Sequence, residues 1–147
     1  MADSLRRIRA LMAGMVVAFA MSLILENVVY NAYPPPEDFM AGDPEHMAKY
    51  VADLADGGFA LMIAGWALSA FAGGMIASMM GRKDLPRLVG VVTFAVLAGA
   101  STNFVMVSYP SWVIISTVFS VMLAGLGAFA LARRMGLERK QQPARKK

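Results

Sequence analysis

The residues that could take part in chemistry are a carboxylate and a few polar side chains within apolar runs of the sequence. Glu26 is the single acidic residue inside an apolar run of the chain, and Asn27 follows it directly. An ionised carboxylate in apolar surroundings is costly, so such a group is protonated, paired or in contact with water, and it is a candidate for function. Thr102 and Asn103 lie at a comparable place in a later apolar run. These four residues predict a polar cluster, which serves either as structural hydrogen bonding between helices or as a site for a proton, a cation or a ligand.

Other chemistry is sparse in this sequence. His46 is the only histidine and there is no cysteine, so neither a multi-histidine metal site nor a Ser-His-Asp arrangement can form. Met75, Met79 and Met80 are close enough in sequence for a soft-metal site, but adaptable packing is the favoured interpretation. Glycine-rich phosphate loops and nucleophile elbows are missing. We therefore expect no enzyme, no metal and no cofactor.

The elements that position these residues are four apolar runs. The chain has 147 residues, 58% of them hydrophobic, with a mean hydropathy of +0.55. The runs at 11–25, 59–80, 88–107 and 113–132 approach the roughly 20 residues that a helix needs to cross a bilayer. The sequence predicts an all-α integral membrane domain over residues 1–132, with two antiparallel hairpins of transmembrane helices. Their expected bounds are about 9–31, 58–81, 87–108 and 112–132.

Lysine and arginine predict the orientation of these helices. Basic residues precede the first helix, separate the second from the third at Arg82, Lys83 and Arg87, and fill the tail at 133–147, whereas Lys49 alone falls on the other side. Such residues favour the cytoplasm, so both termini are expected there, with the basic tail on anionic lipid of the inner leaflet. Nucleic acid is not an expected partner. A cleaved signal peptide over 6–32 is disfavoured, because Glu26-Asn27 stands where small cleavage-site residues belong.

The outer loop at 33–57 is acidic and carries a helix signal. Asp43 can cap a helix that has Pro44 at its first position, and the residues that follow alternate between an apolar and a charged face. A short amphipathic helix on the membrane surface is therefore predicted. Four aromatic residues are expected to anchor the chain at the outer interface: Tyr30, Tyr33, Tyr109 and Trp112. Glu26 lies about one helical turn from Tyr30, so contact with lipid headgroups is another interpretation of this carboxylate.

Small residues at intervals of four mark the second long helix. In a membrane, such a seam lets another helix approach closely, either within the same bundle, which we favour, or in a second copy of the chain. The seam consists of Gly65, Ser69, Gly73, Ala77 and Gly81.

An internal repeat is also visible. Residues 27–34 align without gaps on 103–110 and share an Asn, a Val, a Tyr and a Pro, while 68–72 resemble 126–130. The pattern indicates two parallel copies of a helical hairpin, or a coincidence between membrane helices of similar composition. Thr102 stands at the position of Glu26 in this alignment, so the carboxylate has no counterpart in the second half.

The chain resembles a family of small, uncharacterised bacterial four-helix inner-membrane proteins. The resemblance covers most of the chain and implies its fold and its multi-pass location in the bacterial inner membrane, but no reaction. Members often have a histidine in the second outer turn, where this chain has Tyr109, which weakens a metal or proton-relay role there. The residues that carry the resemblance are Glu26, Tyr33 to Pro36, Trp66-Ala67-Leu68, Gly73-Gly74, Asn103, Pro110 and Trp112.

Two functions are compatible with these features. The first is a non-enzymatic accessory or scaffold protein that packs as a homo-oligomer or in a larger membrane complex, as the small-residue seams suggest. The alternative is a small transporter or lipophilic-ligand-binding protein in which Glu26 titrates. A weaker third interpretation makes the acidic outer loop a docking site for a periplasmic partner.

Overall fold

The computed structural model describes residues 2–40, 42–81 and 84–137. The described residues form five helices and no strand. Four of the helices are long and apolar enough to cross a membrane, and one is short. They are α1 (Ala2–Ala32), α2 (Pro44–Asp53), α3 (Asp56–Gly81), α4 (Leu85–Met106) and α5 (Ser111–Arg134).

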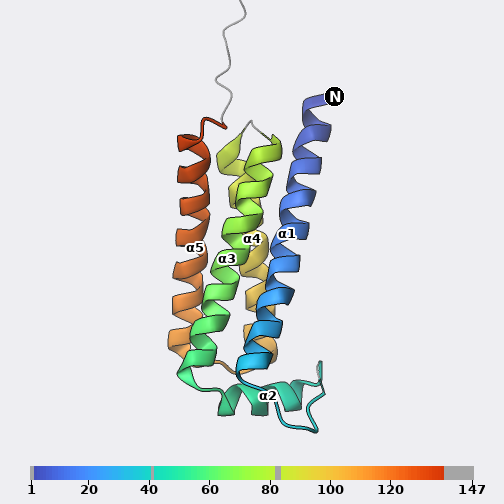
Figure 1. Ribbon diagram of the computed structural model, residues 1–147, viewed down its shortest axis with the longest axis vertical. Coiled ribbons are helices and arrows are strands. Elements are labelled where there is room, and N and C mark those ends of the chain that lie inside the picture. Colours follow the sequence, from blue (N-terminus) through green and yellow to red (C-terminus); the bar gives the residue numbers. More distant parts are fainter. Residues whose placement is uncertain (1, 41, 82–83, 138–147) are drawn as a thin grey trace, which may run out of the picture.

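The four long helices stand side by side, and α2 lies across one end of them (Figure 1). Helices α1 and α4 run in one direction, while α3 and α5 run in the other (Figure 1). Helix α3 contacts all three other long helices and packs most extensively on α1 and α5. The observed helices lie close to the predicted spans except at the start of α1, which begins seven residues earlier than expected. Asp3 in its first turn favours this start, because a carboxylate there opposes the helix dipole.

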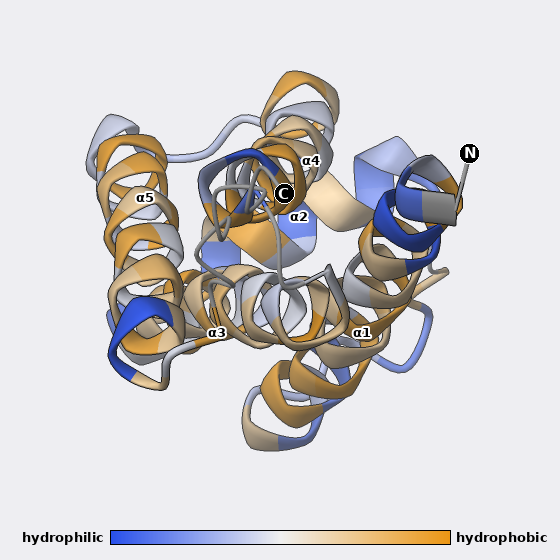
Figure 2. Ribbon diagram, turned by 90° about the horizontal axis from the view of Figure 1, so that it is seen from above, coloured by the Kyte–Doolittle hydropathy of each residue, from blue (hydrophilic) through white to orange (hydrophobic). Residues whose placement is uncertain are grey.

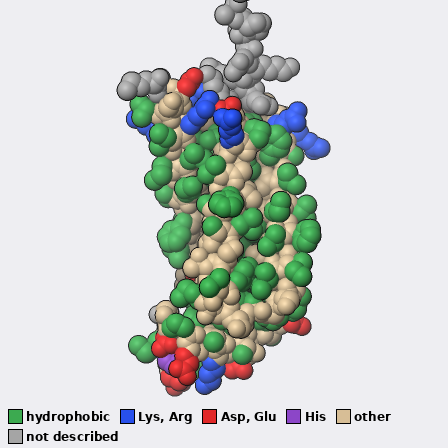
Figure 3. All heavy atoms as spheres, turned by 180° about the vertical axis from the view of Figure 1, so that it is seen from behind, with side chains coloured by type: hydrophobic (Ala, Val, Ile, Leu, Met, Phe, Trp, Pro, Cys, Tyr) green, Lys and Arg blue, Asp and Glu red, His purple; other side chains and the backbone are tan. Residues whose placement is uncertain are grey.

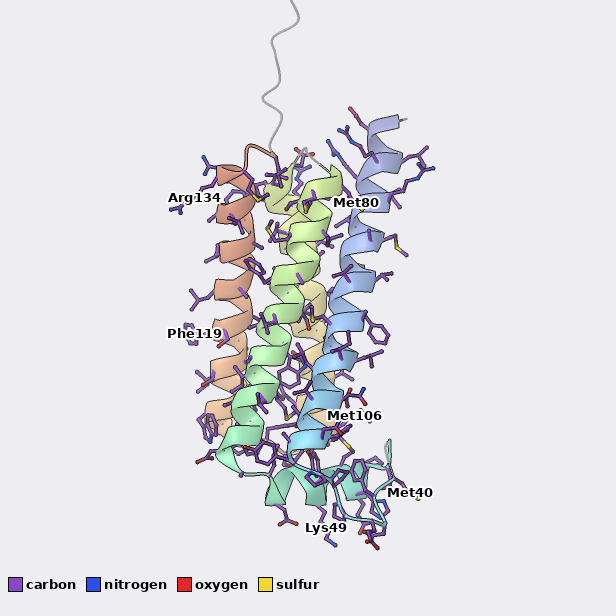
Figure 4. The ribbon with its side chains drawn as sticks, in the orientation of Figure 1. Met40, Lys49, Met80, Met106, Phe119 and Arg134 are labelled. Carbon is purple, nitrogen blue, oxygen red and sulfur yellow. The ribbon has the colours of Figure 1, made fainter. Side chains whose placement is uncertain are left out.

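Apolar side chains cover the outside of the long helices. Seen along the helix axes, hydrophobic residues occur on the outer as well as the inner faces (Figure 2). Phe19, Phe94 and Val105 are 67%, 73% and 87% exposed, and Phe119 points away from α5 (Figure 4). Charged side chains gather instead at the two ends of the bundle (Figure 3).

Helix α2 begins at the predicted cap. The Asp43 carboxylate accepts hydrogen bonds from the backbone N–H groups of Glu45 (2.9 Å) and His46 (3.4 Å), and Pro44 occupies the first turn. These bonds satisfy two of the donors that a helix leaves open at its start. The apolar face of α2, with Tyr50 and Val51, packs on the ends of the long helices rather than facing outward.

The predicted small-residue seam of α3 lies against α1. All five of its residues, Gly65, Ser69, Gly73, Ala77 and Gly81, are buried. A Cβ atom at Gly73 would lie 2.6 Å from the carbonyl oxygen of Gly14 and 2.8 Å from Cβ of Ala18. The Ser22 hydroxyl also donates a hydrogen bond to the Ser69 hydroxyl over 3.0 Å. This face of α3 is therefore occupied by α1 of the same chain.

The end opposite α2 is basic. Arg7 of α1 forms an ion pair with Asp84, which precedes α4 and has a left-handed backbone with φ of 53°. Arg134 lies at this end of α5, whereas Lys49 lies at the α2 end (Figure 4). The predicted basic residues Arg82 and Lys83, and the tail from 138 onward, lie outside the described residues.

Candidate functional site

A cavity lies between α1, α3 and α4, and residues of α2 also line it. Its volume is ≈ 460 Å³, and apolar side chains make up most of its lining. Helix periodicity explains which residues face it. On α1, Phe19, Ser22 and Glu26 recur at intervals of three or four and therefore share one face, as do Gly99 and Asn103 on α4. The polar residues in the lining are Ser22, Glu26, Tyr30, Tyr50, Trp66, Asn103 and Tyr109.

Glu26 is the only charged side chain in this lining. The Tyr30 hydroxyl donates a hydrogen bond to Oε1 of Glu26 over 3.1 Å, from one helical turn further along α1. Neither of the two ion pairs in the described part of the chain includes Glu26. The cavity lining thus combines a few polar side chains, one of which is negatively charged when Glu26 is ionised, with a mostly apolar remainder.

Aromatic side chains form the wall at the α2 end. Tyr30, Phe39 and Tyr50 contact one another with ring centroids 5.5 to 5.9 Å apart. The Tyr50 hydroxyl donates to the backbone oxygen of Tyr33 over 2.8 Å, which ties α2 to the segment that follows α1. Pairwise aromatic contacts of this kind stabilise a packed cluster. These contacts hold the rings of Tyr30 and Tyr50 in place in the cavity wall, where Tyr30 also bonds to Glu26.

A second set of rings continues along α3 and α4. Trp66 lies edge-on to Phe104 with centroids 5.3 Å apart, and Phe104 makes the same kind of contact with Tyr109 at 5.3 Å. Both Trp66 and Tyr109 line the cavity. Each set of rings therefore contributes two aromatic side chains to the cavity lining.

The tyrosine hydroxyls outside the long helices remain protonated donors. Burial, with smaller contributions from the nearby Glu26 carboxylate and Tyr50, raises the pKa of Tyr109 to about 12. Burial also raises the pKa of Tyr50 above its ordinary value. These groups therefore add no negative charge of their own at neutral pH, and the charge of the cavity is that of Glu26.

The structure brings two members of the predicted polar cluster to this cavity and leaves two aside. Glu26 and Asn103 line it. Asn27 donates to the Leu23 carbonyl over 2.8 Å and Thr102 to the Ala98 carbonyl over 3.1 Å, each within its own helix. Neighbouring helix positions point in directions about 100° apart, so one residue of each adjacent pair must turn away.

The predicted interface aromatics divide in a similar way. Tyr30, Tyr33 and Tyr109 pack against the buried cluster that contains Tyr50, at the α2 end. Trp112 is 45% exposed and touches Phe59 edge-on, with centroids 5.7 Å apart. Three of the four aromatics thus contribute to the protein interior, and Trp112 presents more of its surface outward.

Metal ligands are not assembled in the part of the chain that the structure describes, where no group of three or more His, Cys, Asp or Glu side chains could hold an ion. Nδ1 of His46 accepts a hydrogen bond from the backbone N–H of Met40 over 3.2 Å. His46 therefore has a structural role in the loop before α2.

Sequence reasoning missed Ser22, Tyr50 and Trp66, which line the same cavity as Glu26. Ser22 precedes Glu26 by one helical turn, so this spacing was a usable signal. The positions of Tyr50 and Trp66 depend on how α2 and α3 pack, and no local pattern contains that information. No protein-family model matches this chain, and comparisons with curated proteins and with solved structures found no significant match.

Proposed function

We propose that this chain is an integral protein of a bacterial inner membrane that crosses it four times, with both termini in the cytoplasm. The length and apolar character of the four long helices support this proposal. The distribution of charge supports the orientation, because arginines concentrate at one end and acidic side chains at the end that carries α2 (Figure 3). The resemblance to small bacterial four-helix membrane proteins belongs to the same proposal.

The absence of cysteine allows a direct test of this topology. We expect a membrane-impermeant maleimide to label Lys49→Cys in intact spheroplasts and to label Arg134→Cys only after the membrane is opened. Lys49 and Arg134 are both exposed and lie at opposite ends, so each serves as the control for the other. Labelling of both sites in intact spheroplasts contradicts the proposal.

We further propose that the protein binds a lipophilic small molecule in the cavity between α1, α3 and α4. The observation that carries this proposal is a cavity of ≈ 460 Å³ with mostly apolar walls and a polar end formed by Glu26, Asn103 and tyrosine hydroxyls. Ligand sites of about 300–1,000 Å³ commonly combine such walls with a few polar groups that fix orientation. An amphiphilic molecule can place its apolar body along α1 and its polar group beside Glu26. Binding of this kind is required of a carrier and of a transporter alike.

The test is saturable binding of a neutral lipophilic fluorophore, N-phenyl-1-naphthylamine, to the protein in nanodiscs. We expect a hyperbolic fluorescence increase with about one site per chain, above the linear partitioning into empty nanodiscs. A signal that rises linearly and equals that of empty nanodiscs contradicts ligand binding in the cavity.

A second candidate function, the accessory subunit, has its own observation. A groove of ≈ 410 Å³ runs between α4 and α5, lined by Gly90, Thr93, Phe94 and Gly125 among others. The Thr93 hydroxyl is buried and has no hydrogen-bond partner within the described residues. A Cβ atom at Gly90 would meet nothing within 4 Å, so the groove has open space at a small residue where a helix of a membrane partner can pack closely. A strictly monomeric protein without a membrane partner contradicts this function.

The internal repeat remains part of the proposed architecture. The parallel directions of α1 and α4, and of α3 and α5, are those that two copies of one hairpin require (Figure 1). The copies differ in packing, since Gly14 is in close contact with Gly73 whereas a Cβ atom at the corresponding Gly90 would meet nothing within 4 Å. In the proposed repeat, Glu26 therefore belongs to the first copy and has no counterpart in the second.

A further inference from the structure

We propose that the cavity between α1, α3 and α4 selects lipophilic cations, which pair with Glu26 and contact the aromatic rings around it. This inference rests on the proposed ligand-binding function and names the chemical class of the ligand. Three features of the described residues carry it: the charge of the lining, the aromatic rings and the charge at the α2 end of the bundle.

The cavity lining contains an acidic but no basic side chain. Glu26 is its single charged group, and the lining contains no Lys, Arg or His. The hydrogen bond from Tyr30 reaches Oε1 only, so Oε2 is available to a ligand. The Glu26 side chain is exposed on the surface of the protein. Within the proposed membrane span, a carboxylate without a countercharge is costly. A cationic ligand supplies that countercharge, an anion is repelled, and a neutral molecule leaves the carboxylate uncompensated.

The aromatic rings add a second attraction for the same charge. Tyr30, Tyr50, Trp66 and Tyr109 line the same cavity as Glu26. The face of an aromatic ring attracts a cation through its quadrupole, most strongly for tryptophan and where water is excluded. The edge-on contact between Trp66 and Phe104, at 87° between planes, fixes the indole orientation before a ligand arrives. Apolar cations that are weakly hydrated benefit most from such a site.

The acidic α2 end favours the approach of cations. Acidic side chains gather at the end of the bundle that carries α2 (Figure 3). Five of the carboxylates between α1 and the start of α3 are exposed, and Lys49 is the one described lysine or arginine in that segment. Charges of one sign near a cleft raise the local concentration of oppositely charged molecules. The carboxylates are those of Glu37, Asp38, Glu45, Asp53 and Asp56.

The experiment compares two probes of the same shape and opposite charge, tetraphenylphosphonium and tetraphenylborate. Both are titrated by equilibrium dialysis against the protein in nanodiscs of zwitterionic lipid, with empty nanodiscs subtracted. We expect saturable binding of tetraphenylphosphonium and none of tetraphenylborate. Glu26→Gln preserves size and the capacity to accept from Tyr30, and it is expected to weaken tetraphenylphosphonium binding about tenfold or more, or 1.4 kcal/mol at tenfold. Glu37→Gln, an exposed carboxylate outside the cavity lining, is the matched control and should bind as the wild type does.

The outcomes separate this inference from the function on which it rests. Equal binding of the two probes, or unchanged tetraphenylphosphonium binding in a Glu26→Gln protein that melts as the wild type does, overturns the selection of cations while naphthylamine binding stands. If naphthylamine and both charged probes all fail to saturate, the proposed ligand site itself is wrong. Loss of tetraphenylphosphonium binding in Glu37→Gln as well assigns the effect to general surface charge and overturns the role of Glu26.

Discussion

Replacement of Gly73 by valine is expected to lower the free energy of unfolding by about 3 kcal/mol, the upper end of the usual cost of overpacking. The first added atom already conflicts with its surroundings, because a Cβ atom there would lie 2.6 Å from the Gly14 carbonyl oxygen. The same atom would lie 2.8 Å from Cβ of Ala18 and 2.9 Å from Cγ1 of Val92. Helices α1, α3 and α4 therefore converge at Gly73, and the nearest obstacle is backbone, which cannot rotate away.

Thermal unfolding in mild detergent measures this effect, and Gly90→Val is the matched control. The chemical change is identical, and Gly90 also lies within a long helix, but a Cβ atom there meets nothing within 4 Å. We expect the Gly90 variant to melt at or near the wild-type temperature. Equal loss of stability in both variants would indicate a general penalty for valine rather than a close contact between helices.

The same region illustrates how far the sequence determines the fold. The apolar runs predict the four long helices, because a run of about 20 apolar residues has the length that a helix needs to cross a bilayer. The spacing of small residues from Gly65 to Gly81 likewise predicts a face for close packing. Which helix covers that face was left open, because Gly14 is a single glycine in α1 and carries no periodic signal of its own.

The candidate site was predictable only in part, for a related reason. Glu26 and Asn103 stand out as polar residues in apolar surroundings, and both line the cavity. Helices α1 and α4 are apolar on most sides, so hydrophobic periodicity does not indicate which face turns inward. The sequence alone therefore does not distinguish Asn27 from Glu26, or Thr102 from Asn103. The packing of α1, α3 and α4 determines which residue of each pair lines the cavity. The aromatic wall depends on α2 folding back over the bundle, a contact between segments that no local pattern encodes.

Replacement of Gly99 by leucine is expected to abolish saturable naphthylamine binding and to leave the protein folded. Gly99 lines the cavity from α4, and a Cβ atom there meets nothing within 4 Å, so the new side chain gains space without a clash. Leucine also favours the helical state by about 1 kcal/mol over glycine, which protects stability. The ligand loses the volume that the leucine occupies, and a cavity of ≈ 460 Å³ leaves little room for both.

Gly90→Leu is the control that separates the two candidate functions, because it makes the same change on the same helix in the other groove. It is expected to bind naphthylamine as the wild type does. If the groove between α4 and α5 holds a partner helix, native mass measurement in mild detergent should show that Gly90→Leu has lost a partner which Gly99→Leu retains. Undiminished fluorophore binding in Gly99→Leu would exclude the cavity as the ligand site, since a blocked site cannot bind as an open one does.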